Sequence, residues 1–254
     1  MTQEQIPPTR RERQREATFD EIVSSSRALL RAGEEVSLRA VASRMGMTAP
    51  ALYRYVGSYQ ELVELVAFEI DKAATAEFRL AAATQPDDDP MAQLVCASVA
   101  FRRWALANHA EFSMVFANPV ADSHCQRREI ITAWTSGLYF HGLLLQLWER
   151  NGFTHPSLDE LEPVVAESFR DPLFPVDMSA FPQDHLGLLW TFMEAWATLY
   201  GTVTLEVFGH LDPRVIESGA LFAHKLAEWL PRLGEPDEDG RYRELLRAEI
   251  ARDQ

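Results

Sequence analysis

The sequence predicts an all-α protein in which a small helix-turn-helix domain precedes a larger helical domain. Apolar residues recur three and four positions apart along most of the chain, which is the spacing of one helix face. Capping side chains begin these runs, and glycines or prolines end them. No alternation of apolar and polar residues, the pattern of a half-buried strand, interrupts them. With 254 residues and 47% apolar composition, the chain can bury a sizeable core.

The first two helices are bracketed by capping residues. Thr9 and Glu12 have the spacing of a capping box, which begins a helix that runs to about Arg31. Ser37 is expected to cap a short second helix, because its hydroxyl can accept a free amide of the first turn. Gly46 ends that helix, since glycine readily adopts the left-handed conformation of a helix end.

The third and fourth helices carry similar signals. Thr48 is expected to cap the third, with Pro50 in its first turn, where a missing N–H does no harm. Ser58 and Glu61 form a second capping box ahead of a long helix that runs to about Ala83.

Helices also fill the rest of the chain, apart from a proline-rich loop. The expected segments are 90–108, 110–116, 130–152, 158–169, 186–208, 212–229 and a C-terminal helix that contains Tyr242, Leu246 and Ile250. The uncharged stretch 130–148 approaches a membrane span in length, but its polar side chains favour a buried helix. The aspartates of 87–89 and 237–239 are expected to lie in solvated linkers.

Charge is spread unevenly along the chain. The formal net charge is −14, which argues against a protein coated everywhere with positive charge. However, the first 60 residues carry nine arginines and seven carboxylates, so the acidic excess lies entirely in the rest of the chain. This asymmetry suggests two tasks, one of which can involve a polyanion.

The most informative stretch is 37–62, where two short helices meet at a tight turn. Leu52 and Val56 supply the inward face of the second helix. Around them are small residues and residues with hydroxyl or guanidinium groups: Ala49, Pro50, Ala51, Tyr53, Arg54 and Tyr55. Such groups suit close approach to base edges and phosphates. On periodicity alone, a surface helical hairpin with packing tyrosines is an equally good interpretation.

Residues 36–62 closely resemble the DNA-binding signature of tetracycline-repressor-like (TetR family) transcriptional regulators. The matching positions are Ala42, Gly46, Thr48, Leu52, Tyr53, Tyr55, Val56, Glu61 and Leu62. The resemblance implies a homodimer with an N-terminal DNA-binding domain and a C-terminal helical domain for ligand binding and dimerisation. We therefore expect a DNA-binding domain over 1–60 with a disordered arm at 1–8, a second domain over 61–234, and an acidic linker with a short helix over 235–254.

The residue pattern and the resemblance together give the candidate DNA-binding residues. They are Ser37, Arg39, Thr48, Ala49, Pro50, Ala51, Tyr53, Arg54, Tyr55 and Tyr59. Tyr59 stands where family members commonly have a lysine, so a lower affinity and a weaker salt dependence are expected. Four arginines between residues 10 and 15 either add phosphate contacts or form a solvated first turn.

Aromatic residues are concentrated in the second domain, because all six Trp and thirteen of the 14 Phe lie beyond residue 60. This loading indicates a large core or an apolar cavity, and it favours an apolar or aromatic effector. The candidate ligand-binding residues are Trp104, Trp134, Tyr139, His141, Trp148, Trp190, Met193 and Tyr200. Each of them also suits a core position.

A second resemblance concerns dimerisation. Residues 196–213 resemble a recurrent C-terminal motif of one TetR subgroup, on the strength of Trp196, Gly201 and the run 208–210. In family members, the last two long helices pair with their symmetry mates. The resemblance places these helices near 186–208 and 212–230, where Gly201 and Gly219 would permit close approach.

The leading hypothesis is a cytoplasmic, ligand-responsive transcriptional regulator that acts as a repressor on a palindromic operator. We expect it to bind double-stranded DNA, a second copy of itself and a small effector, and no membrane. No catalytic motif, metal-ligand spacing or cofactor-binding loop is found, so no enzyme activity, metal or cofactor is expected. The alternative is an all-α small-molecule-binding protein or enzyme with a merely structural helix-turn-helix. A third possibility is a DNA-binding dimer without an inducer.

Overall fold

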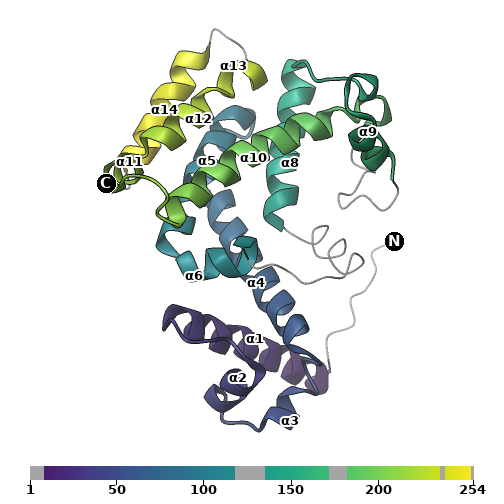
Figure 1. The fold of residues 1–254 in the computed structure, drawn as a ribbon, viewed down its shortest axis with the longest axis vertical. Helices are drawn as coiled ribbons and strands as arrows, with labels where there is room; N and C mark the ends of the chain where they lie inside the picture. Colours follow the sequence, from purple (N-terminus) through teal and green to yellow (C-terminus); the bar gives the residue numbers. More distant parts are fainter. Residues whose placement is uncertain (1–8, 118–134, 172–181, 235–237, 253–254) are drawn as a thin grey trace. The chain divides into compact units, whose positions relative to one another are not determined.

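The structure is a computed structural model that describes residues 9–117, 135–171, 182–234 and 238–252. Every regular element in these ranges is helical, which confirms the predicted all-α class (Figure 1). The chain divides into two compact units. The first comprises Met1–Ile70 with Ala110–Ala121, and the second comprises Asp71–His109 with Asp122–Gln254. The expected domain bounds of 1–60, 61–234 and 235–254 stay predictions, and the expected arm at 1–8 lies outside the described residues.

The first unit is built on three helices and the start of a fourth. They are α1 (Arg10–Arg31), α2 (Leu38–Arg44), α3 (Ala49–Leu52) and α4 (Tyr59–Ala82), joined by most of α6 (His109–Phe112) and by the π-helical turn η1 (Ser113–Ala117). The predicted capping box of α1 is confirmed, because the Thr9 hydroxyl accepts the Glu12 N–H at 3.3 Å and the Glu12 carboxylate accepts the Thr9 N–H at 2.7 Å. Ser37 Oγ likewise accepts the Ala40 N–H at 3.2 Å.

The second unit surrounds the buried helix α5 (Pro90–Ala107). Its other elements are α8 (Thr135–Asn151), η2 (Leu158–Glu160), α9 (Pro163–Arg170), η4 (Gln183–His185), α10 (Leu188–Val207), α11 (Pro213–Ser218), α12 (Ala220–Ala227), α13 (Leu230–Leu233) and α14 (Asp239–Ala251). Helices α8, α10 and α14 all pack on α5 (Figure 1). Burial raises the pKa of the Cys96 thiol on α5 to about 11, so this thiol stays protonated at neutral pH.

The segment 212–230, expected to be one helix, is instead broken into α11, α12 and the start of α13. The break lies at Gly219, whose φ of +63° is the left-handed conformation that favours glycine. A Cβ atom here would lie 2.9 Å from Ile250 Cγ2 on α14 and 3.4 Å from Arg102 Cζ on α5. Gly219 therefore permits close packing within the chain, which the sequence pattern did not reveal.

A buried ion pair joins α5 to α10. Arg102 Nε donates to Glu206 Oε2 at 2.5 Å, and the two side chains are 6% and 0% exposed. Arg102 also donates to the carbonyl oxygen of Ile216 in α11 and lies over the Phe222 ring at 5.5 Å. Burial raises the pKa of Glu206, although the neighbouring guanidinium favours its charged form. Arg102 thus links α5 to α10, α11 and α12.

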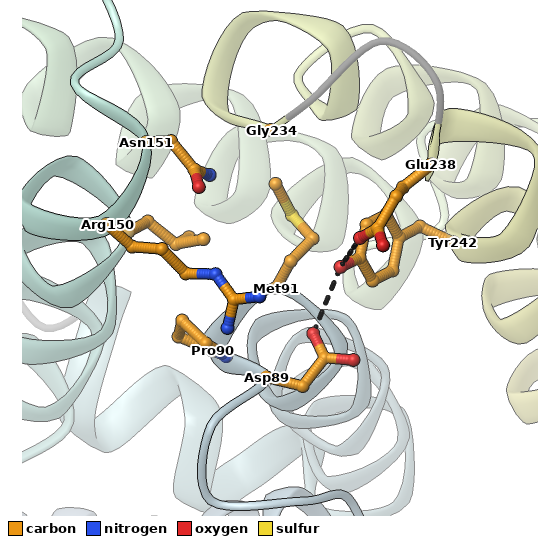
Figure 2. Close-up of a pocket in the computed structure, with 9 residues that line it drawn as sticks. Asp89, Pro90, Met91, Arg150, Asn151, Gly234, Glu238 and Tyr242 are labelled. Atoms are coloured by element: carbon orange, nitrogen blue, oxygen red, sulfur yellow. Dashed lines mark hydrogen bonds between the residues drawn. The ribbon is translucent and has the colours of Figure 1, made fainter.

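Asp89 does not lie in a solvated linker as expected. It is buried, and Oδ1 caps α5 by accepting the Ala92 N–H at 3.0 Å. The same oxygen accepts a hydrogen bond from the Tyr242 hydroxyl at 3.1 Å. The oxygen of that hydroxyl also lies 2.7 Å from Glu238 Oε2 (Figure 2). The guanidinium of Arg241 bonds the second Asp89 oxygen. These contacts fasten α14 to the start of α5.

The uncharged stretch 130–148 is helical from Thr135 onward, and its first five residues lie outside the described ranges. Among the described helices, none combines the length and apolar character needed to cross a membrane. Phe140, Leu143 and Leu147 of this helix are buried, as expected for a core helix.

Candidate nucleic-acid interface and effector region

The helix-turn-helix is held together by a small buried core. Val41 and Ala42 from α2 and Leu52 from α3 are at most 1% exposed, and Val56 after α3 is fully buried. For Leu52 and Val56, this is the inward position that the periodicity predicted. Burial of one face fixes which residues of α3 point outward.

The turn between α2 and α3 depends on Gly46. Its φ is +67°, and its N–H donates to the Ser43 carbonyl at 3.1 Å while the Met47 N–H donates to the Ala42 carbonyl at 2.9 Å. This pair of bonds is a Schellman ending, which requires a left-handed residue. A Cβ atom added at Gly46 would meet no other atom within 4 Å, so backbone conformation rather than space selects glycine.

Helix α3 is shorter than expected. Its regular part spans only Ala49–Leu52, although hydrogen bonds continue the turn as far as the Val56 N–H, which donates to the Leu52 carbonyl at 3.1 Å. Thr48 precedes the helix as predicted, but its hydroxyl makes no capping hydrogen bond. That hydroxyl is therefore not used to stabilise the helix start.

The outward face of this motif is polar. Tyr53 and Tyr59 are 51% and 52% exposed, and Arg39 and Arg54 are also exposed. Of the other residues assigned to DNA, Thr48 and Pro50 are exposed, and Ser37, Ala49, Ala51 and Tyr55 are half-buried. All ten thus retain some surface.

Tyr55 has a packing role in addition to any contact with DNA. Its ring meets Phe19 of α1 edge-on, with centroids 6.0 Å apart, and the Arg15 guanidinium lies over the same Phe19 ring at 5.5 Å. The packing interpretation therefore holds for Tyr55 but not for the exposed Tyr53.

A salt bridge secures α1 within the first unit. Arg27 donates from Nε and Nη2 to both carboxylate oxygens of Glu111, each at 2.9 Å, and Arg31 approaches the same carboxylate at 3.3 Å. Two parallel bonds to a buried carboxylate fix orientation as well as distance. Sequence reasoning missed this contact, because its partners lie 84 positions apart.

In the second unit, three of the predicted effector residues join one group of rings, here called the aromatic cluster. Its members are Phe78, Phe101, Trp104, Tyr139, Phe140, Trp196 and Tyr200. Tyr200 stacks on Trp196 at 5.9 Å, and the Arg79 guanidinium lies 4.4 Å from the Tyr139 ring. Burial raises the pKa of Tyr139.

The other predicted effector residues are not all part of this cluster. His141 stacks on Phe192, and burial lowers its pKa to about 4, so it is neutral at pH 7. Trp148 packs on His185 instead, Trp190 is half-buried, and Met193 is 47% exposed. Trp134 lies outside the described residues.

Sequence reasoning also missed Asp71, a buried residue of α4. Its Oδ2 accepts the Thr135 N–H at 2.7 Å, the Thr135 hydroxyl at 3.0 Å and the Ser136 N–H at 3.2 Å. Asp71 therefore caps α8 from another helix, beside the aromatic cluster. The signal for Asp71 in the sequence was an acidic residue on an otherwise apolar helix face.

A small pocket lies where α14 meets α5 and α8, between Asp89, Arg150 and Glu238 (Figure 2). Its volume is about 30 Å³, which suits one or two water molecules rather than an effector.

Comparisons with known proteins show to which family the chain belongs. Residues 94–228 match the family model of the tetracyclin repressor-like C-terminal domain. The HTH-type transcriptional regulators Rv1816 of Mycobacterium tuberculosis and Mb1846 of Mycobacterium bovis are each 26% identical over 197 residues, or 71% of this chain and 78% of theirs. The crystal structure of a candidate regulatory protein, SCO4313, is 23% identical and superposes with a TM-score of 0.58, covering 88% of this chain and 100% of that one. The chain therefore belongs to the tetracycline-repressor-like family of DNA-binding transcriptional regulators.

Proposed function

We propose that the protein is a homodimeric repressor that leaves a palindromic operator when a small apolar or aromatic effector binds. The exposed side of the helix-turn-helix carries the DNA-binding part of this proposal. Tyr53 is 51% exposed although the adjacent Leu52 is fully buried. A motif that served only for packing would gain nothing from exposing this ring and the neighbouring Arg54.

The N-terminal end of α3 is proposed to enter the major groove. Ala49, Pro50 and Ala51 are small enough to bring the backbone close to base edges. The Thr48 hydroxyl, which makes no capping bond, can bond a base or a phosphate. Arg39, Arg54 and the two exposed tyrosines would hold the phosphates on either side.

Fluorescence anisotropy with DNA from upstream of the protein's own gene tests this surface. Tyr53→Ala should weaken binding at least tenfold. Arg54→Gln should reduce the slope of log K against log salt concentration by about two, because a dimer loses one phosphate contact in each protomer. Arg247→Gln is the matched control, because Arg247 is an exposed arginine on α14. If the Tyr53 variant and the control bind equally well, this face is not the DNA-binding surface. If the upstream DNA lacks the operator, a selection from random DNA sequences supplies a bound sequence on which the same variants are compared.

An exposed apolar stripe on α10 supports dimerisation. Met193, Leu205 and Phe208 are 47%, 40% and 42% exposed, and Ala197 and Gly201 lie between them at four-residue spacing. One face of the helix is therefore apolar over four turns. Across a two-fold axis, this stripe would pack against the same stripe and against α12 of the second copy. Helix α12 takes the role that was expected for a single helix over 212–230.

Light scattering on Leu205→Glu tests this interface, with Val164→Glu as control. Val164 is 69% exposed on α9, so its substitution changes a surface apolar residue outside the stripe. The α10 variant should be monomeric and the α9 variant dimeric. Two dimeric variants would exclude the stripe as the interface.

The aromatic cluster and His141 are proposed to contact the effector. A cluster of rings suits a flat ligand, and the neutral imidazole of His141, stacked on Phe192, suits an uncharged one. To switch operator occupancy from nearly full to nearly empty, the effector must prefer the released conformation by about 10⁴-fold. A screen of aromatic compounds for release of labelled operator tests this, and compounds that act on wild type should act less on His141→Phe. Equal action on both would place the effector elsewhere.

A further inference from the structure

Two histidines far apart in the sequence meet in the second unit. His155 lies in the loop after α8, and His185 lies in η4, directly before α10. His155 Nε2 and His185 Nδ1 are 3.0 Å apart, and His155 Nδ1 lies 2.9 Å from the Pro156 carbonyl oxygen. Neither histidine belongs to the helix-turn-helix or to the aromatic cluster.

The carbonyl of Pro156 fixes the tautomer of His155. A carbonyl oxygen only accepts, so His155 Nδ1 must carry the proton and donate it. In the neutral ring, Nε2 then holds a lone pair that faces His185. A histidine that binds a metal usually donates its other ring N–H to a carbonyl or carboxylate in this way, which orients the ring. His155 therefore has the arrangement of a metal ligand.

The distance between the two nitrogens also suits a shared ion. Imidazole nitrogens bind Zn²⁺ at about 2.0–2.1 Å, so two ligands of one ion lie roughly 2.9 Å apart at a right angle and about 3.4 Å apart at the tetrahedral angle. The observed 3.0 Å lies within this range; without an ion it is an N–H···N hydrogen bond, whose proton the ion would replace. His185 can move its proton to Nε2, and Nδ1 then offers a second lone pair.

The loops that carry the pair are held closely together. A Cβ atom at Gly187 would overlap the Pro156 carbonyl oxygen, so only glycine allows this approach. The Trp148 ring packs against His185 with centroids 4.6 Å apart. Both histidines are half-buried, so an ion from solvent can reach them while their rings are supported from one side.

We propose that His155 and His185 form a binding site for one divalent transition-metal ion of the Zn²⁺, Ni²⁺ or Cu²⁺ class. Water completes the coordination, since the described residues contain no group of three or more histidine, cysteine or acidic side chains placed to hold a metal. Two imidazoles select these borderline ions over Mg²⁺, which prefers oxygen ligands. The site differs from the sequence-based expectation of no metal, because its ligands are 30 positions apart.

Isothermal titration calorimetry on full-length protein without a histidine tag tests the proposal. Wild type should bind one Zn²⁺ or Ni²⁺ per chain, and Cu²⁺ more tightly, whereas MgCl₂ should give no heat of binding. His155→Ala and His185→Asn should each weaken Zn²⁺ binding at least about tenfold. Asparagine at 185 can still donate a hydrogen bond to His155 Nε2, so this variant retains the fold while losing the ligand. Far-UV circular dichroism checks that the His185→Asn variant retains the fold.

His224→Ala is the matched control, because His224 is an exposed histidine on α12 that pairs with Glu228. Its binding should equal that of wild type. The proposal is overturned if wild type binds none of the three ions, or if His224→Ala weakens binding as much as the two site variants do. Loss of binding in both site variants, with folding and the control unchanged, supports it.

Discussion

The buried pair Arg102–Glu206 permits a quantitative prediction about stability. Glu206→Leu removes the charge that compensates Arg102, whose side chain is only 6% exposed. Leaving one member of a buried pair uncompensated costs about 3–5 kcal/mol. Arg102→Met should cost about as much, because it leaves the fully buried Glu206 carboxylate and the Ile216 carbonyl without this partner.

The double variant Arg102→Met with Glu206→Leu should be far more stable than the two single effects suggest. An apolar pair of similar volume often replaces a buried ion pair at little cost. The Ile216 carbonyl loses Arg102 as a donor but keeps the Gly219 N–H at 3.0 Å, so the lost bond costs about 1 kcal/mol. We therefore expect the double variant to lie within about 3 kcal/mol of wild type. The coupling between the two positions is then at least about 3 kcal/mol.

Urea unfolding at one fixed protein concentration measures these differences, with the slope checked for constancy. Asp212–Arg214 is the control pair, because its side chains are 43% and 87% exposed. Arg214→Met should leave the free energy of unfolding nearly unchanged, because water screens this exposed pair. If the two single effects at 102 and 206 simply add in the double variant, the pair does not link α5 to α10 energetically, and the reasoning fails.

Three further predictions concern single residues. Gly219→Ala should lower the thermal midpoint by the equivalent of about 1–3 kcal/mol, because alanine is strained at φ +63° and its methyl would crowd α14; an unchanged midpoint would contradict this. Ser37→Ala should cost about 1 kcal/mol of stability, whereas Thr48→Ala should leave stability unchanged and weaken operator binding, since only Ser37 makes a capping bond. Because the folded pKa of His141 is about 4 and the unfolded value is near 6.5, the unfolded state binds a proton first on acidification. Wild type should therefore lose on the order of 3 kcal/mol between pH 6.5 and pH 4 relative to His141→Phe, and identical pH profiles of urea midpoints would refute this.

Features that depend on neighbours in the sequence could be predicted. The Thr9 capping box, the Ser37 cap and the Gly46 turn each use a bond between residues at most five positions apart, so a local pattern is enough to identify them. The exposed face of α3 follows from the same logic, because burial of Leu52 fixes the direction of Tyr53. The proposed DNA-binding surface was thus the most predictable part of the protein.

Features that depend on distant partners could not be predicted. Asp89 looks like a linker residue until Tyr242 is brought beside it, and the break at Gly219 follows from packing against Arg102 and Ile250. The candidate effector residues were chosen by chemical type, and folding separates Trp148 and Met193 from the aromatic cluster. No spacing rule relates such residues, because tertiary packing alone decides which of them meet.

The attachment of α14 to α5 has a consequence for synthesis on the ribosome. Asp89 and Tyr242 are separated by 153 positions, so α5 leaves the ribosome long before the helix that covers it. At about 5–20 residues per second, the delay is roughly 8–30 s. During this time the α14-facing side of α5 lacks its native cover and is accessible to chaperones and proteases. A nascent chain that stops before α14 should therefore be cleared by proteolysis, which would act as a check that only full-length regulator accumulates.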